Sequence, residues 1–216
     1  MLKPITDGHQ LEPAIKHQNL ARQYDFMKTA YVLWLDQERP HVTDSFLKDL
    51  NFYAAHSLSN SPGQYRDTTK ENVRVGDHIP PPWEDVGRFM NDFFGVVLSN
   101  FEKWDALSLA AYALWRLNWV HPFRQGNGRT ARAISYFLIC QKYRAWFPGR
   151  TIVPEQIRRN RDEYCELLRN ADKAMNQTHE TDLDPLKSFI NRMLKNQINE
   201  HLADVSKASN ENGRAG

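Results

Sequence analysis

Residues 105–143 read DALSLAAYALWRLNWVHPFRQGNGRTARAISYFLICQKY, and this stretch decides the fold. Its two ends, residues 105–119 and 130–143, are apolar on nearly every side, as is typical of helices at the buried centre of a domain. Between them stand a histidine, a Gly-Asn-Gly turn and two arginines three positions apart. The pattern predicts two central buried helices joined by a polar loop, and residues of that kind between core helices indicate a functional site.

The rest of the chain is predicted to be mainly helical. Apolar residues recur at steps of three and four in five further segments, which indicates amphipathic helices. These segments are residues 20–34, 43–50, 83–93, 155–170 and 184–194. Residues 57–82 are instead rich in Ser, Asn, Gly and Pro, with a β-leaning piece at 72–75, so we expect a loop with a short hairpin. The fold class is mainly α with a short β-hairpin.

Composition limits the classes of protein that the chain can belong to. Its 216 residues fit one domain with a small appendage, and its net charge of +2 argues against a nucleic-acid partner. The longest apolar stretch, residues 109–115, is far shorter than the roughly 20 residues of a membrane span. No secretory signal is recognised. Cys140 and Cys165 have neither CxxC nor zinc-ligand spacing, and we expect reduced thiols in the core and not a disulfide. We expect a cytoplasmic protein without a membrane partner, and export as an effector stays open.

The Gly-Asn-Gly turn and the arginines together indicate a phosphate site. A helix begins with unpaired N–H groups and a partial positive charge, and glycines let an anion approach them closely. Gly126, Asn127 and Gly128 precede an apolar helix in this way, and Asn127 is also a suitable N-cap. Arg129 and Arg132 lie on one face of the first turn. Two positive charges there oppose the helix dipole unless an anion is bound.

His121 immediately precedes this anion site. Histidine is the side chain best suited to accept a proton near neutral pH. Phe123 has the position of a core anchor that pins the loop between the two helices. A base beside a site for several phosphates indicates attack of a hydroxyl group on phosphorus.

These residues resemble a known signature. HPFRQGNGRTAR is similar to the motif HPFx[D/E]GNGRxxR of the Fic (filamentation induced by cyclic AMP) family, and it departs at one specified position. PGQYR (62–66), NVRVG (72–76) and PPP (80–82) resemble the family's flap region, and RDEYCELL (161–168) resembles the helix after its nucleotide site. We therefore expect an N-terminal helical extension over 1–42, a Fic-type helical domain over 43–203 and a disordered tail over 204–216.

The resemblance implies a protein adenylyltransferase that moves AMP from ATP, with Mg²⁺, to a Ser, Thr or Tyr hydroxyl of a target protein. In that reading His121 is the general base. Gly126, Asn127 and Gly128 form the anion hole around the α- and β-phosphates. Arg129 and Arg132 bind the β- and γ-phosphates and stabilise the departing pyrophosphate.

The resemblance also assigns two peripheral elements. The flap (Val73, Arg74, Val75 and Gly76) would pair with an extended segment of the target by strand addition. Tyr164 is a weaker candidate for the adenine pocket, and an ordinary core position explains it at least as well.

Gln125 is the departure from the motif, which has Asp or Glu to bind the metal at this position. An amide oxygen can coordinate Mg²⁺ but brings no negative charge, so the metal should bind more weakly. Two alternatives therefore stay open: a nucleotide-binding regulatory module with impaired catalysis, and an enzyme of the same fold that transfers another nucleotide or removes AMP. The second glycine of GNGR argues against the phosphate-transferring Doc branch.

Regulation and assembly are less defined by the sequence. Many family members carry an inhibitory helix with the pattern [S/T]xxxE[G/N], and no segment of this chain fits it. A separate antitoxin-like protein that supplies this helix is our first expectation, beside an unrestrained enzyme and a divergent internal helix from the first forty residues. Tyr24, Tyr31 and Trp34 pack either on the core, which is the default, or on a second copy in a homo-oligomer.

Overall fold

The protein is a bundle of α-helices, as predicted. The computed structural model describes residues 4, 8–37, 41–67, 74–178 and 180–212. The α-helices are α1 (Glu12–Trp34), α2 (Asp44–Ala55), α3 (Val86–Asn100), α4 (Ala106–Val120), α5 (Asn127–Tyr143), α6 (Val153–Arg159), α7 (Arg161–Thr178) and α8 (Asp184–Asn212), and a 3₁₀ turn, η2 (Trp83–Asp85), precedes α3. Over the described residues, no helix combines the length and the hydrophobicity that a membrane span requires.

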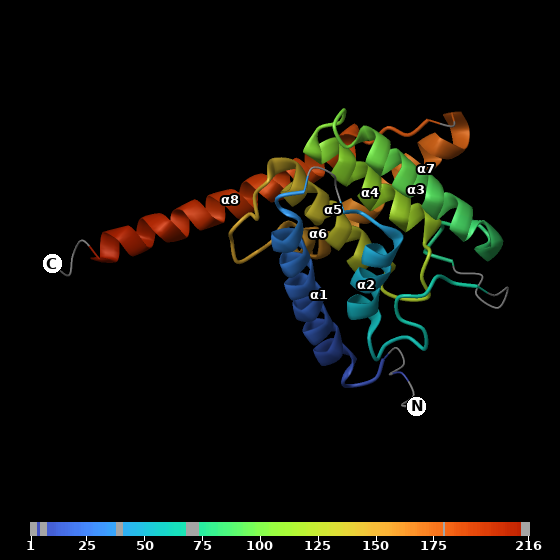
Figure 1. Cartoon of the computed structure of the whole chain (residues 1–216), viewed down its shortest axis with the longest axis horizontal. Helices are drawn as coiled ribbons and strands as arrows, with labels where there is room; N and C mark the ends of the chain where they lie inside the picture. Colours follow the sequence, from blue (N-terminus) through green and yellow to red (C-terminus); the bar gives the residue numbers. More distant parts are fainter. Residues whose placement is uncertain (1–3, 5–7, 38–40, 68–73, 179, 213–216) are drawn as a thin grey trace.

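Helices α4 and α5 form the centre of the bundle, as their sequences predict. Leu109, Leu114, Ile134 and Phe137 are completely buried between the surrounding helices. Figure 1 shows α1 and α2 on one side of this pair and α3 and α7 on another. The loop from α4 to α5 is therefore held by core helices at both ends.

Helix α1 is integrated into the same core. Met27, Ala30 and Tyr31 are buried with residues of α2 and α5. The ring of Trp34 packs edge-on against Phe46 and Phe137, at centroid distances of 5.0 and 6.1 Å. The aromatic face of this helix thus packs on its own domain, which confirms the default expectation.

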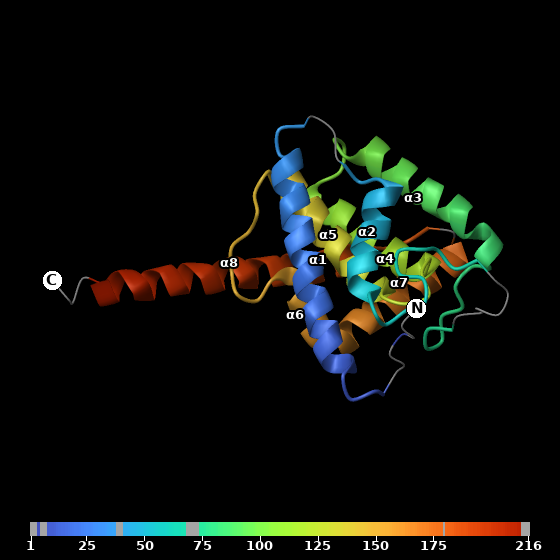
Figure 2. The same ribbon diagram turned by 60° about the horizontal axis from the view of Figure 1, so that its bottom comes forward.

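The ends of several helices differ from those predicted. Residues 155–170 are not one helix: α6 ends before Asn160, whose side-chain amide bonds the Gln156 carbonyl at 2.8 Å, and α7 follows in a new direction. The segment predicted as a disordered tail is helical as far as Asn212 and projects away from the bundle as the end of α8 (Figure 2). This segment extends a helix whose earlier part is already fixed by packing.

Candidate active site

The loop between α4 and α5 begins with a constrained histidine. His121 caps α4 in the left-handed conformation (φ 49°, ψ 56°), which few non-glycine residues adopt. Phe123 follows, with 1% of its surface exposed, and its ring packs on Tyr65 at a centroid distance of 5.1 Å. Phe123 therefore lies in the position of the predicted core anchor.

Gly126 forms the N-cap of α5 with φ 82°. A Cβ atom at this position would lie 3.0 Å from the side-chain nitrogen of Asn51 and 3.4 Å from two alanine methyl groups. Only glycine satisfies both the left-handed backbone and this close contact. Gly126, Asn127 and Gly128 all line one large cavity.

Asn127 is not the N-cap, contrary to the expectation from sequence. It is the first residue of α5, and its side chain bonds backward to Phe123, accepting from the N–H at 2.9 Å and donating to the carbonyl at 2.7 Å. The pair of bonds closes the loop on itself. Asn127 thus shapes the anion site and does not cap the helix.

Asn51 on α2 is a site residue that the sequence did not reveal. It is buried, and its amide nitrogen donates to the Gln125 carbonyl at 2.8 Å and to the Thr130 hydroxyl at 3.2 Å. Its oxygen accepts from the N–H of Gly63 at 2.9 Å. The only signal was a polar residue on the apolar face of α2, next to Leu50.

Arg129 and Arg132 lie in the first two turns of α5 and line one cavity. Arg129 donates to the Ala54 carbonyl at the end of α2. Burial lowers the pKa of Arg129 to about 10, with a further contribution from Arg132, and burial also lowers the pKa of Arg132. Neither forms an ion pair with a carboxylate of the described residues, so the cavity carries uncompensated positive charge.

His121 lines the same cavity. Burial lowers its pKa to about 4, and the positive charges of Arg66 and His78 act in the same direction. The Asn118 carbonyl partly offsets these effects, although the buried Nδ1 makes no well-formed hydrogen bond to the described residues. The imidazole is therefore neutral at pH 7 and able to accept a proton.

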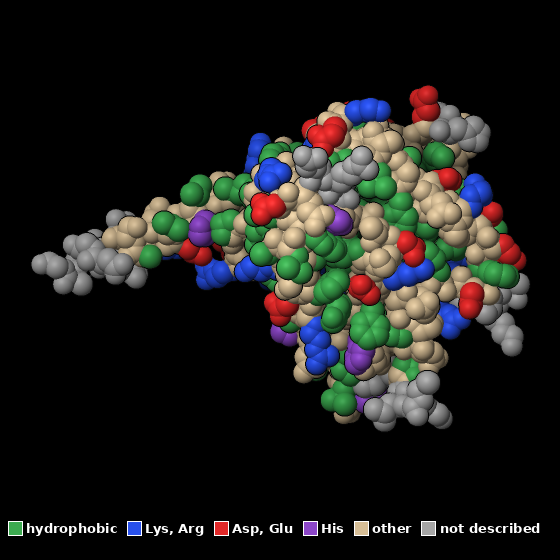
Figure 3. All heavy atoms as spheres, in the orientation of Figure 1, with side chains coloured by type: hydrophobic (Ala, Val, Ile, Leu, Met, Phe, Trp, Pro, Cys, Tyr) green, Lys and Arg blue, Asp and Glu red, His purple; other side chains and the backbone are tan. Residues whose placement is uncertain are grey.

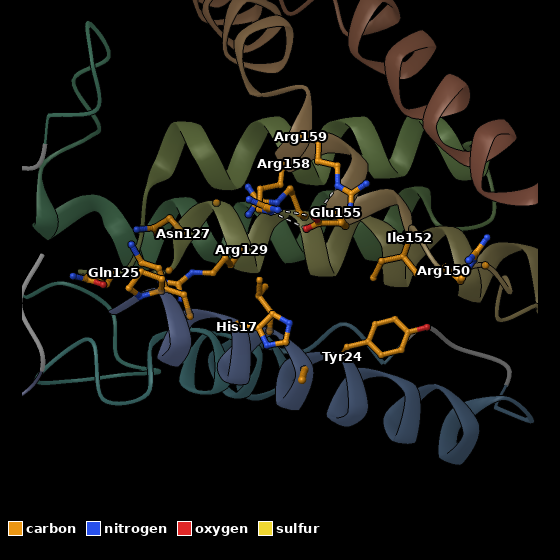
Figure 4. A pocket seen from close by; sticks show the side chains of 18 of the residues that line it. His17, Tyr24, Gln125, Asn127, Arg129, Arg150, Ile152, Glu155, Arg158 and Arg159 are labelled. Atoms are coloured by element: carbon orange, nitrogen blue, oxygen red, sulfur yellow. Dashed lines mark hydrogen bonds and ion pairs between the residues drawn. The ribbon is translucent and has the colours of Figure 1, made fainter. Parts of the chain in front are cut away.

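The cavity has a volume of about 1070 Å³ and lies between α1 and the pair α5 and α6. Figure 4 shows Gln125 and Asn127 at one end, Ile152 and Arg150 at the other, and Arg129 between them. His17 and Tyr24 of α1 form the opposite wall, and Glu155 holds Arg158 and Arg159 by hydrogen bonds of 2.6 and 2.9 Å. The arrangement suits an elongated anion.

Gln125 lines the cavity as the motif requires, but its surroundings do not form a metal site. Over the described residues, no group of three or more His, Cys, Asp or Glu side chains could hold a metal ion. The local protein donor is then one neutral amide oxygen, which does not match the carboxylates that usually hold Mg²⁺. The residues present therefore do not fit a resident Mg²⁺ ion.

The predicted flap lies beside His121. Val75 and His78 exchange backbone hydrogen bonds of 3.0 and 3.1 Å around Gly76, and the Arg74 guanidinium donates to the Gly76 carbonyl; Val73 lies outside the described residues. The His78 ring donates to the Trp119 carbonyl at 2.8 Å, and its other nitrogen lies 3.4 Å from Asp172. These contacts attach the flap to α4 and α7.

Tyr164 lies behind the arginines, with 5% of its surface exposed. Its hydroxyl accepts from Asn118 at 2.8 Å, and its ring stacks on Phe189 at 6.4 Å. Those contacts are typical of a core residue.

Comparison with known proteins places this geometry in a family. Residues 41–139 match the model of the Fic/DOC family. The chain is 35% identical over 154 residues to the protein adenylyltransferase Fic of Nematostella vectensis, a match that spans 70% of this chain and 31% of that protein. The chain thus spans less than a third of that relative's length.

Solved structures show the same fold. Fic-1 of C. elegans superposes with a TM-score of 0.71 at 20% identity, over 94% of this chain and 55% of that one. IbpAFic2, covalently tethered to Cdc42, superposes with a TM-score of 0.56 at 21% identity, over 86% of this chain and 56% of that one. With the HPFRQGNGR loop between α4 and α5 and the family model over residues 41–139, the chain belongs to the Fic/DOC family.

Proposed function

We propose that this protein is an adenylyltransferase, which transfers AMP from ATP to a hydroxyl group of a target protein. The observation that carries the proposal is a neutral, buried imidazole in the same cavity as two arginines that have no carboxylate partner among the described residues, at a glycine-capped helix N-terminus. The adenylyltransferase named among the relatives is consistent with it.

The chemistry follows from the chain's own groups. Because Nδ1 of His121 is buried, Nε2 faces the cavity and takes the proton of the attacking hydroxyl. The hydroxyl oxygen forms a bond to the α-phosphorus as the bond to the bridging oxygen breaks, and pyrophosphate leaves. The N–H groups at Gly126–Gly128 stabilise the charge that develops on the phosphoryl oxygens, and Arg129 and Arg132 stabilise the pyrophosphate.

The flap is proposed to dock the target. Val75 and Ile79, with 42% and 75% of their surfaces exposed, offer apolar contacts beside His121. An extended target segment that pairs with the backbone at 73–76 would bring its hydroxyl toward the histidine. In this proposal residues 43–203 form the catalytic domain. Helix α1 is an extension that closes one side of the cavity. Tyr164 is proposed to lie next to the adenine pocket and not to bind the nucleotide itself.

Restraint by a separate inhibitory protein also stays a proposal. Glu12 is the carboxylate that influences Arg129 most, but it accepts from the Gly8 N–H at 2.7 Å and pairs with Lys16. Within the described part of the chain, Arg129 therefore forms no ion pair with a carboxylate. This is consistent with an inhibitor that another chain supplies.

The test is transfer of label from α-labelled ATP to lysate proteins, with His121→Ala as the inactive variant. His201→Ala, which removes a histidine on α8 away from the cavity, is the matched control. We expect label with the wild type and the control, and none with His121→Ala. Equal labelling by all three proteins would exclude His121 as the base.

One observation favours a second function, a nucleotide-binding regulatory module. Gln125 supplies no charge for a metal, so turnover could be lost while binding persists. ATP binding without label transfer by the wild type, together with label transfer by Gln125→Glu, would establish this alternative.

A further inference from the structure

His78, at the end of the flap hairpin, contacts two helices through the two nitrogens of its ring. Nε2 donates to the Trp119 carbonyl near the end of α4 at 2.8 Å, and Nδ1 lies 3.4 Å from Oδ2 of Asp172 on α7. Asp172 is held in turn by α4, because Nε1 of Trp115 donates to its Oδ1 at 2.9 Å. The side chains of His78 and Asp172 are only 14% and 16% exposed. The flap is therefore attached to the rest of the domain through a largely buried pair of titratable groups.

The contact between His78 and Asp172 requires a proton of its own. A carbonyl oxygen only accepts hydrogen bonds, so the ring nitrogen that bonds Trp119 carries a hydrogen. In a neutral imidazole the other nitrogen is then an acceptor, and an ionised carboxylate is an acceptor as well. Two acceptors that face each other repel, so either His78 is an imidazolium or Asp172 is a carboxylic acid that donates to Nδ1. Both forms hold the same number of protons, and the pair therefore binds one proton as a unit.

The pair borders a second cavity, which has a volume of about 640 Å³. Acidic and basic side chains are interspersed on the face of the molecule that Figure 3 shows, and the wall of this cavity has the same mixture. Apart from the pair, the charged side chains that line it are Asp77 beside the flap and Glu166, Arg169 and Lys173 of α7. On α4, the Arg116 guanidinium lies over the Trp119 ring, 4.6 Å from its centroid. Charges of both signs thus surround the pair, so its direct contacts decide where the proton lies.

The pair is also close to the candidate base. Trp119, which accepts from His78, precedes His121 by two residues, and the positive charge of His78 contributes to the low pKa of His121. Arg66, which acts on His121 in the same direction, donates to the His121 carbonyl at 2.9 Å. Burial raises the pKa of Asp172, which favours the bound proton, while the positive charge of His78 acts in the opposite direction.

We infer that one proton, shared by His78 and Asp172, holds the flap beside His121 and makes the two residues positioning residues for the proposed transfer. The inference rests on the proposed function, because it concerns the place where the target hydroxyl meets the imidazole. While the proton is bound, the hairpin at residues 74–78 is attached to α4 and α7. When the pH rises and the proton leaves, two acceptors face each other and the attachment weakens. This direction is opposite to that of His121, whose contribution to stability is lost as the pH falls.

Hydrogen exchange of the flap amides in the full chain tests the inference without any activity. The N–H groups of Val75 and His78 each bond the carbonyl of the other, so their protection reports whether the hairpin is held. Amides of α4 and α5 are the internal reference for global stability. We expect the protection of the flap in the wild type to fall at least about tenfold, relative to that reference, between about pH 6 and about pH 9. His78→Ala should show the low value at both pH values.

Asp172→Asn separates the proton from the contact itself. An amide keeps an acceptor for Trp115 and offers a permanent N–H to Nδ1 of His78, so this variant should protect the flap at both pH values. Glu166→Gln is the matched control, because it neutralises another acid of α7 that lines the same cavity, and it should keep the pH dependence of the wild type. Equal protection of the wild-type flap at both pH values would overturn the inference. So would an Asp172→Asn variant that behaves either as the wild type or as His78→Ala.

Label transfer from α-labelled ATP to lysate proteins then tests the positioning role. The ratio of the rate at about pH 9 to the rate at about pH 6 should be higher for Asp172→Asn than for the wild type and for Glu166→Gln. Equal ratios in all three proteins would show that the pair fixes the flap without positioning the target. Absence of label from every protein would overturn the proposed function and the positioning role together, while the exchange data still decide whether the proton holds the flap.

Discussion

The imidazole of His121 is buried and lies near the positive charge of Arg66, and both features lower its pKa. Its pKa of about 4 lies below the ordinary value of 6.5, so the unfolded chain takes up a proton in this range before the folded protein does. The stabilising contribution is complete above pH 6.5 and is lost as the pH falls toward 4. A bound triphosphate would reverse part of this effect by placing negative charge near the ring.

Stability measured against pH tests this property. Between pH 7 and pH 5 the free energy of unfolding of the wild type should fall by about 2 kcal/mol more than that of His121→Asn, because burial lowers the pKa of His121 to about 4 in the folded protein. Urea unfolding at the two pH values gives the comparison. An equal loss in both proteins would show that the ring is solvated in the folded state.

We expect a change of charge at residue 125 to alter the metal dependence of the proposed reaction. Gln125→Glu restores a negative charge at the cavity wall, so the Mg²⁺ concentration for half-maximal label transfer should fall about tenfold, and activity at low Mg²⁺ should rise. Gln141→Glu, a substitution of the same kind on α5 outside the cavity lining, is the control. An unchanged magnesium titration would exclude residue 125 as a ligand.

At the scale of elements, α2 determines the shape of the loop before α5. Asn51→Ala would remove the donor to the Gln125 carbonyl and leave the Gly63 N–H unsatisfied in the interior. We expect a loss of about 2 kcal/mol in the free energy of unfolding, and a lower kcat than that loss alone explains. Thermal unfolding and label transfer measure the two effects.

The exposed Asn91 on α3 provides the control for this variant, since Asn91→Ala removes the same side chain outside the site. A destabilised Asn51→Ala with wild-type kcat would show that Asn51 supports only the fold. The experiment thus separates a positioning role from a structural one.

The sequence predicts those structural elements that are determined by residues close together along the chain. Two apolar helices around HPFRQGNGR predict the core pair α4 and α5, and spacing along one helix places Arg129 and Arg132 together. Contacts between distant segments have no such local signal. Asn51 reaches Gln125 across 74 residues, and His78 reaches Asp172 from the flap, so neither was predicted.

The prediction of helix boundaries was wrong for a related reason. The periodicity of residues 155–170 continues through Asn160, but the side chain of Asn160 ends α6 by bonding the backbone of Gln156. Asn127 was expected to cap α5, yet its side-chain amide bonds both the backbone N–H and the carbonyl of Phe123. In both cases the asparagine side chain has several possible hydrogen-bond partners. The spacing of residues along the sequence does not specify which partner it bonds.

At the scale of the whole molecule, one residue of α8 connects several segments that are distant in the sequence. Gln197 is fully buried, and its amide nitrogen donates to the Tyr136 hydroxyl at 2.9 Å and to the Phe147 carbonyl at 2.9 Å. Its oxygen accepts from the Val153 N–H at 2.9 Å. This one side chain connects α5, the loop after it and the start of α6.

Beyond Gln197 the contacts of α8 become few. Glu200 still bonds Thr151 at 3.0 Å, and Asp204 pairs with Arg150, whose side chain is 75% exposed. An exposed pair of this kind contributes little to stability. The last residues of α8 should therefore add almost nothing to the folded domain.

Two changes in the same helix test this division. Gln197→Ala leaves the Val153 N–H buried without a partner and removes the donor to the Tyr136 hydroxyl and the Phe147 carbonyl, so the free energy of unfolding should fall by about 2–3 kcal/mol. Removal of residues 205–216 should change it by less than about 0.5 kcal/mol. Chemical unfolding of both variants, followed by circular dichroism in the far ultraviolet, gives the two values. If the truncation costs as much as Gln197→Ala, the projecting end of α8 is held by contacts in solution, and its stability belongs to an assembly larger than one chain.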